Sequence, residues 1–202
     1  MKKLIFALAL AFCAASVSAA ATAPAASASA SAPADEDGAI LDKIESSASK
    51  SISGNFVETR MNAAGKVAAT LKGELTYTAP DVFSMFYTEP NGDFFMISGD
   101  VMKSGISGTE TVYDLRKNVM MRTLSHVLLC SFSGRIRDLV SEIDADCAAA
   151  RDGSGYVVTL TAKVKSTRGF SSVQIFYDSA CRISKMIMTE WSKRSTVYEF
   201  AK

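Results

Sequence analysis

The residues able to perform covalent or acid–base chemistry are few and do not form a catalytic set. His126 is the only histidine among 202 residues, and it stands in an apolar segment where a structural role is expected. Triads, zinc sites and histidine proton shuttles need more partners than this. Ser107 follows Gly105 but lacks the full G-x-S-x-G sequence of a nucleophile elbow. We therefore expect no catalytic residues and a protein that is not an enzyme.

Acidic residues offer the next candidate site. Glu142, Asp144 and Asp146 alternate along the chain, which favours the exposed face of a strand over a calcium site. No glycine-rich phosphate loop and no Cys/His spacing of a zinc or redox site occurs. The sequence predicts neither a metal nor a cofactor.

Composition excludes a dedicated nucleic-acid binder. Lys and Arg number 22 and Asp and Glu 21, so the net charge is +1, without a basic surplus. Hydrophobic residues make up 48% of the chain, as in an ordinary globular domain.

The first 19 residues have the form of a secretory signal peptide. Two lysines precede a short apolar run, and Val17-Ser18-Ala19 gives the small-x-small cleavage pattern. The run is too short for a membrane span, which predicts a soluble mature protein. Cys13 raises the alternative of a lipid-anchored protein, but Phe12 precedes it where a small residue is needed.

Residues 20–34 contain only Ala, Thr, Pro and Ser, which predicts a flexible linker before a folded domain over residues 35–202. Three cysteines remain after cleavage, namely Cys130, Cys147 and Cys181. An oxidising compartment permits one pair, and its identity is left open. Buried apolar thiols are the simpler expectation.

The domain is expected to be mainly β, with two helical segments. Apolar residues at helical spacing predict a helix of about three or four turns in the segment from Asp35 to Gly54, and a second helix around Leu124–Phe132, closed by Gly134. Between and after them, turn residues every eight to twelve positions predict an antiparallel meander of ten or eleven short strands. The strands are expected at 56–61, 66–78, 82–87, 94–98, 101–106, 111–114, 143–149, 156–164, 171–177, 183–190 and 196–200.

The strand pattern favours a container. Phe83, Met85 and Tyr87 share one face, yet Val82 and Phe86 make the opposite face apolar as well. A long meander must close or curl to hide its edges, and two amphipathic helices need a surface to cover. We expect the helices to pack on the concave side of a curled sheet, with aromatics and adaptable methionines lining the space. The alternative is that the same residues fill a dry core.

Several segments resemble the LolA-type periplasmic lipoprotein carriers, which show F…Q, G-x-L, P-x-x-F/R-x-W-x-Y/M and x-P at matching intervals. The corresponding segments are Gly73-Glu74-Leu75, Pro80 to Tyr87 and Glu89-Pro90. Five further segments are similar to the Bacteroidota-type branch of this family: Val112-Tyr113-Asp114, Tyr156 to Ala162, Val173 to Asp178, Lys185 to Glu190 and Glu199-Phe200. The resemblance covers the chain from about residue 37 to 202.

This resemblance implies an unclosed antiparallel β-barrel of about 11 strands, with a helical lid over a hydrophobic cavity. It implies a monomeric carrier that accepts triacylated lipoproteins from an inner-membrane ABC-type release complex and delivers them to the outer membrane or a receptor there. Phe83 would hold the mouth position, and Met85 the place of the cavity aromatic. The expected acyl-chain cavity is lined by Phe56, Leu75, Tyr77, Phe83, Met85, Tyr87, Leu124 and Leu128.

The chain departs from the proteobacterial pattern at the lid latch, because Ala79 replaces the arginine before Pro80. Its C-terminal turn, Trp191 to Ser195, also lacks the usual glycine of the related branch. Phe83→Glu is expected to damage cargo uptake or handover while leaving the fold intact. The alternative function is a lipid-binding module that does not shuttle, such as a sensor or a dedicated glycolipid or pigment carrier, and a third option is a structural domain with a filled core.

Overall fold

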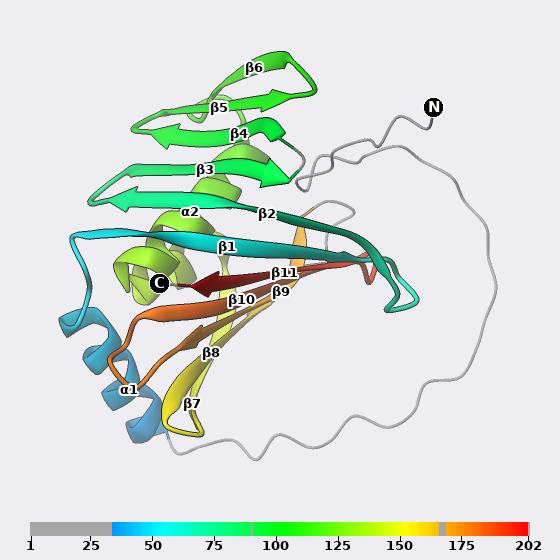
Figure 1. Cartoon of the computed structure of the whole chain (residues 1–202). Coiled ribbons are helices and arrows are strands. Elements are labelled where there is room, and N and C mark those ends of the chain that lie inside the picture. The colour runs from blue at the N-terminus through cyan, green and yellow to red at the C-terminus, as the bar shows by residue number, and fades with distance from the viewer. Residues whose placement is uncertain (1–33, 90, 166–168, 202) are drawn as a thin grey trace. The chain divides into compact units, whose positions relative to one another are not determined.

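The fold is built on one antiparallel sheet of 11 strands in the order β6-β5-β4-β3-β2-β1-β11-β10-β9-β8-β7 (Figure 1). β6 and β7 are its two edges, so the sheet curls without closing into a complete barrel. The computed structural model describes residues 34–89, 91–165 and 169–201. The predicted signal peptide (1–19) and linker residues 20–33 lie outside the described residues.

The elements follow the chain as a helix, six strands, two helices and five strands. The strands are β1 (Ser51–Met61), β2 (Val67–Thr78), β3 (Val82–Glu89), β4 (Asn91–Ser98), β5 (Val101–Ile106), β6 (Thr109–Asp114), β7 (Ala145–Asp152), β8 (Gly155–Ala162), β9 (Phe170–Tyr177), β10 (Ile183–Glu190) and β11 (Ser195–Ala201). The helices are α1 (Ala34–Ser46), α2 (Val119–Ser133) and α3 (Ile136–Ile143). The unclosed, mainly β fold predicted above is confirmed.

The first helix, α1, has the predicted three to four turns but occupies only the first part of the segment assigned to it. It ends at Ser46, and Gly54 lies inside β1, which pairs with β2 on one side and β11 on the other. β2 pairs with residues 51–61 and β11 with residues 55–61, so a helix continued to Gly54 would have removed backbone partners from the centre of the sheet.

A third helix, α3, was missed, and the acidic residues after it do not alternate along a strand. Glu142 lies in α3, and Asp144 takes a left-handed conformation (φ 48°) as its C-cap. Asp146 lies in β7, and the Lys163 ammonium is 3.3 Å from the Asp144 carboxylate. The three carboxylates are therefore separated by the end of a helix, which rules out the predicted common strand face.

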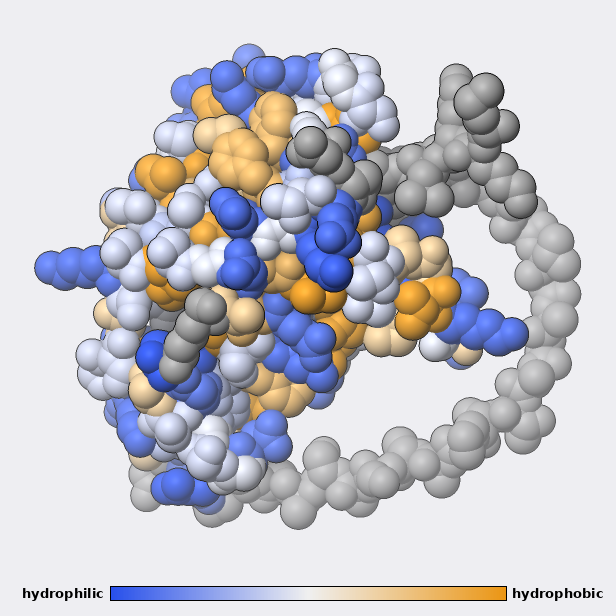
Figure 2. Space-filling view, viewed as in Figure 1, coloured by the Kyte–Doolittle hydropathy of each residue, from blue (hydrophilic) through white to orange (hydrophobic). Residues whose placement is uncertain are grey.

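The two faces of the sheet are not equivalent. Along β3, Phe83, Met85 and Tyr87 point inward and are buried, whereas Val82 and Phe86 are 42% and 47% exposed. Phe86 stacks obliquely on Phe94 of β4, with 6.1 Å between ring centroids. Figure 2 shows apolar residues gathered on this outer face, over the upper strands of Figure 1. α2 packs on the inner face of β3, and the apolar side chains of Val82 and Phe86 on the outer face remain exposed to solvent.

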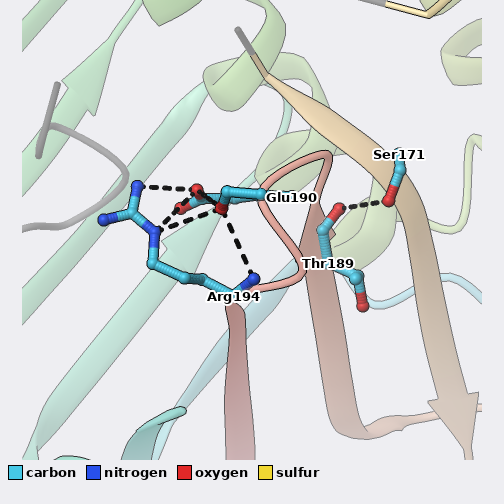
Figure 3. A network of polar contacts seen from close by, with 5 residues as sticks. Ser171, Thr189, Glu190 and Arg194 are labelled. Atoms are coloured by element: carbon cyan, nitrogen blue, oxygen red, sulfur yellow. Dashed lines mark hydrogen bonds and ion pairs between the residues drawn. The ribbon is translucent and has the colours of Figure 1, made fainter. Parts of the chain in front are cut away.

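The hairpin between β10 and β11 explains how the chain turns without the glycine of the related sequences. Lys193 adopts φ 64°, a conformation that glycine takes at no steric cost. The Arg194 guanidinium, with Nε at 3.0 Å and Nη2 at 2.7 Å, holds the Glu190 carboxylate across the turn (Figure 3). Ser192 donates a third hydrogen bond to the same carboxylate. These polar contacts stabilise a turn in which Lys193 adopts a backbone conformation that favours glycine.

Gly73 sits at the closest approach of three strands. It lies directly opposite Phe56 of β1, and β2 changes register against β3 between Lys72 and Gly73. A Cβ atom at this position would overlap the carbonyl oxygen of Phe86 and lie 2.7 Å from the Phe56 ring. The glycine of the G-x-L segment is therefore required by packing.

We predict that Gly73→Ala lowers the free energy of unfolding by about 1–3 kcal/mol, because backbone and a buried ring must both move. Gly38→Ala is the matched control, since a Cβ there would meet no atom within 4 Å and the helix should gain about 0.5–1 kcal/mol. Urea unfolding of both variants measures the two changes. Equal stability of Gly73→Ala and the parent protein would contradict the packing argument.

Candidate functional site

The eight residues predicted to line an acyl-chain cavity all lie in the buried interior. Six come from β1, β2 and β3, where alternation places them on the inner face, and two come from α2. Each has at most 3% of its surface exposed: Phe56, Leu75, Tyr77, Phe83, Met85, Tyr87, Leu124 and Leu128. Their role in binding a ligand stays a prediction.

Phe132 of α2, which was not among the predicted site residues, stands at the centre of this interior. Its ring centroid lies 5.1 Å from Phe83, 6.0 Å from Tyr77 and 5.0 Å from Phe200. Figure 1 shows α2 behind β1–β3, on the face turned away from the viewer. A side chain of the helix thus occupies the space between the concave face and α2, which we call the chamber.

The burial of Phe83 changes one expectation. Phe83 is 0% exposed, and the rings of Phe95 and Phe132 pack against it. A carboxylate placed among these rings by Phe83→Glu would lose its hydration without gaining a partner. We therefore expect this variant to destabilise the fold, in contrast to the expectation from the sequence.

The ends of α2 are defined by local contacts. The Asn118 side chain accepts a hydrogen bond of 3.1 Å from the Met121 amide and caps the first turn. Gly134 ends the helix with φ 70°, and a Cβ there would meet the Ile44 carbonyl oxygen at 3.0 Å. Between these ends the helix carries largely apolar side chains, most of them buried. The stability of such a helix comes from packing its apolar side chains against the rest of the domain rather than from surface charges.

Tyr177 of β9 joins α2 to the sheet. Its hydroxyl donates a buried hydrogen bond of 2.9 Å to the carbonyl oxygen of Ser131. This carbonyl belongs to the last helical turn, where no amide of the helix is available to bond it. Burial raises the pKa of Tyr177 far above its ordinary value, so the phenol keeps the proton that it donates.

Arg137 joins α3 to α1. Its guanidinium donates to the Glu45 carboxylate at 2.6 Å, the Asp42 carboxylate at 2.8 Å and the Gly38 carbonyl at 3.2 Å. Ala79 has no side chain that could replace the family's latching arginine. In this chain Tyr177 and Arg137 supply contacts that hold the helices in place.

A buried polar cluster interrupts the apolar inner face and was not anticipated from the sequence. Glu58 is 0% exposed and lies opposite Tyr198 of β11. It accepts hydrogen bonds from the Tyr87 hydroxyl at 2.6 Å and from Arg60 Nε. Burial and the Glu58 charge raise the pKa values of Tyr87 and Tyr198 well above normal. Alternation from Phe56 already placed Glu58 on the inner face, so the spacing could have revealed it.

The thiols and the remaining chemical candidates do not form a reactive centre. Cys130, Cys147 and Cys181 are all free, and burial raises the pKa of the Cys130 thiol to about 11, which keeps it protonated. Ser107 is a turn residue (φ 50°) whose amide donates to Asp93. His126 faces Glu142, with Nδ1 3.5 Å from Oε1. Within the described part of the chain, no helix has the length and apolarity needed to cross a membrane.

A pocket of about 510 Å³ opens beside α2, on a different side of the helix from the chamber. None of the eight predicted residues lines it. Its walls come from α2, α3 and the chain turns at Pro80–Asp81, Gly99–Asp100 and Leu115–Arg116.

We predict that stability falls steeply above pH 10 because of Tyr87, Tyr177 and Tyr198. The unfolded chain releases their protons near pH 10, whereas the folded chain retains them because their pKa values are raised. Their stabilising contribution is complete below pH 10, and above it each lowers the free energy of unfolding by about 1.4 kcal/mol per pH unit.

Urea unfolding between pH 8 and 11 measures the slope. Tyr198→Phe should reduce the slope of the free energy of unfolding against pH by the contribution of about one proton. The burial argument fails if the three single Tyr→Phe variants leave the slope unchanged.

A model of the family described as outer membrane lipoprotein carrier protein LolA matches residues 47–202. No curated protein matches the chain significantly.

A LolA superfamily protein from Nitrosomonas europaea, whose structure has been solved, is 12% identical, with 82% of this chain and 91% of that chain covered and a TM-score of 0.39. A DUF1329 family protein from Desulfovibrio piger is 12% identical, with 84% and 92% covered and a TM-score of 0.46. The lipoprotein LppX of Mycobacterium tuberculosis is 11% identical, with 82% and 95% covered and a TM-score of 0.39.

The family match begins just after α1 and includes every strand, α2 and α3. Because it extends over most of the chain, the protein belongs to the LolA family of outer membrane lipoprotein carriers.

Proposed function

We propose that this protein is a periplasmic carrier that binds the acyl chains of triacylated lipoproteins and moves them from the inner to the outer membrane. Membership of the LolA family supports the class of cargo. The chamber supports the mode of binding, because apart from the Glu58 cluster its inner wall is apolar over β1, β2 and β3, and the helix that packs on this wall, α2, is largely apolar.

The need for such a carrier follows from the cost of exposing lipid to water. Each acyl CH₂ group in water costs about 0.8 kcal/mol, so three long chains cost tens of kcal/mol. A carrier must remove this cost without binding so tightly that the cargo cannot leave. Buried methionines suit this compromise, since their flexible thioether chains adapt to a lining that changes: Met85, Met102, Met121, Met186 and Met188.

The observation that carries the proposal is that α2 fills the chamber with its own side chain. Phe132 occupies the place among Tyr77, Phe83 and Phe200 that an acyl chain would take. Displacement of α2 exchanges one apolar partner of the sheet for another, so the apolar surface stays covered in both states. The eight predicted lining residues then contact the acyl chains.

In this proposal the donor is an inner-membrane ABC-type release complex, and the acceptor is the outer membrane or a receptor there. The protein acts as a monomer, because one chamber serves one lipid anchor. Tyr177 and Arg137 take the part of the missing latch, and their contacts must open and re-form in each cycle.

Release from spheroplasts of the host bacterium tests the shuttle. Purified protein lacking residues 1–19 is added and the spheroplasts are sedimented. We expect outer-membrane lipoproteins in the supernatant in equimolar complex with it. Absence of release, with lipid still detected on the protein by native mass spectrometry, would contradict the shuttle and favour a sensor or a dedicated-cargo protein. Absence of both would show that the chamber is a filled core.

Tyr177→Phe tests whether α2 is the cover that opens. Removal of the hydroxyl leaves the Ser131 carbonyl without its partner and should lower the free energy of unfolding by about 1–2 kcal/mol. Because this weakens the closed state only, we expect faster uptake of a fluorescent fatty-acid probe, measured by stopped flow.

Tyr113→Phe is the matched control, because the Tyr113 hydroxyl makes no hydrogen bond within the described residues and the variant should take up the probe at the parent rate. If the two variants take up the probe at the same rate, α2 is not held shut by Tyr177.

A further inference from the structure

The pocket beside α2, here called the charged trough, follows one stripe of that helix. The helix contributes five residues to the lining of the trough, at spacings that place them on one side of α2: Arg122, Ser125, His126, Leu129 and Cys130. The chamber side of the same helix carries Leu124, Leu128 and Phe132. The helix therefore separates an apolar chamber from a charged trough.

The trough is elongated. Arg122 and Cys130 are eight positions apart on α2, which corresponds to about 12 Å along the helix axis. Arg135, beyond the end of α2, extends the lining further. An extended peptide advances about 3.3 Å per residue, so the trough can accommodate four or more residues. Its volume of about 510 Å³ lies within the range of ordinary ligand sites.

The lining carries charges of both signs. Four carboxylates reach it, from Asp81, Asp100, Asp138 and Glu142. Three guanidinium groups face them, from Arg116, Arg122 and Arg135. The contacts between these groups are long, at 3.4 Å for Arg122 to Glu142, 3.7 Å for Arg135 to Asp138 and 3.9 Å for Arg116 to Asp100. Arg116 is held more closely by Asp114, outside the lining, at 2.9 and 3.0 Å. Such half-exposed pairs contribute little and can exchange for a ligand at small cost.

Two buried polar atoms at this boundary have no hydrogen bond of good geometry within the described residues. One is Arg122 Nε in the lining, whose nearest carboxylate is the 3.4 Å contact to Glu142. The other is the Tyr77 hydroxyl, which lies behind the trough lining: its ring packs in the chamber, and the hydroxyl has only a poorly formed contact with the Ser133 side chain and lies within electrostatic range of Arg135. A buried donor without a hydrogen-bond partner is destabilising, and a ligand carbonyl would supply the missing partner.

We propose that the charged trough binds the polar peptide that directly follows the lipid-modified residue of the cargo. This inference rests on the proposed function, because it assumes that the acyl chains lie under α2. The peptide emerges at the border of the chamber, supplies carbonyl oxygens to Arg122 Nε and the Tyr77 hydroxyl, and matches side chains of either charge. A phospholipid headgroup fits less well, since carboxylates outnumber guanidinium groups in the lining and a compact headgroup leaves an elongated trough partly empty.

Two synthetic probes separate the trough from the chamber. One is tripalmitoyl-cysteine amide, and the other is the same group followed by a six-residue peptide of Ser, Lys and Asp. Competition against a fluorescent fatty acid gives both dissociation constants. We expect the lipopeptide to bind about tenfold more tightly, which corresponds to about 1.4 kcal/mol. Arg122→Gln should remove most of this advantage and leave the affinity for tripalmitoyl-cysteine amide unchanged.

Arg151→Gln is the matched control, because Arg151 is an exposed arginine of β7 outside the lining and the variant should keep the full advantage. Equal affinity of the parent protein for the two probes overturns the proposal. So does a loss of phosphatidylethanolamine binding in Arg122→Gln as large as the loss for the lipopeptide, which would assign the trough to a lipid headgroup. If neither probe binds to the protein, the proposed function itself is overturned.

Discussion

The contact of Phe132 with the concave face is the interaction on which the rest of the structure depends. A sheet with an apolar face must cover that face, and the rings of Tyr77, Phe83 and Phe200 are covered by this one residue of α2. The remaining helical contacts place that side chain. Asn118 and Gly134 set the ends of α2, and Tyr177 bonds its last turn to β9. In the proposed function, this helix is the part that the acyl chains displace.

Polar groups bound the apolar surface on two sides. Glu58, with Arg60 and Tyr87, is buried within the inner face of the sheet, where hydrogen bonds from both partners compensate for its lost hydration. The charged trough lies on a different side of α2 from the chamber. Under the proposed function, an acyl chain meets an apolar lining of limited extent, and the groups attached to it meet a polar one.

Strand alternation made the buried interior predictable from the sequence. The short helix α3 and the features assembled from distant parts of the chain could not be predicted in the same way. Period-2 spacing placed the strand residues of the predicted lining correctly in the buried interior. The helix α3 was missed although Ile136, Leu139 and Ile143 have helical spacing, because the run is short and its end was assigned to a strand. Phe132 was recognised as helical, but its position among three rings depends on strands that are distant in sequence. The trough could not be predicted, since its charges come from three chain turns and two helices.

The pairing of β1 with β11 places the last strand of the chain in the middle of the sheet. Asn55 lies opposite Ala201 and Met61 opposite Ser195, so strands from the two ends of the domain form its central ladder. Until the final residues are available, the sheet consists of two separate halves, each with an unpaired edge where its centre should be. Contacts this distant in sequence also slow folding. A chain that emerges with its N-terminus first therefore completes this central ladder only after β11 has emerged.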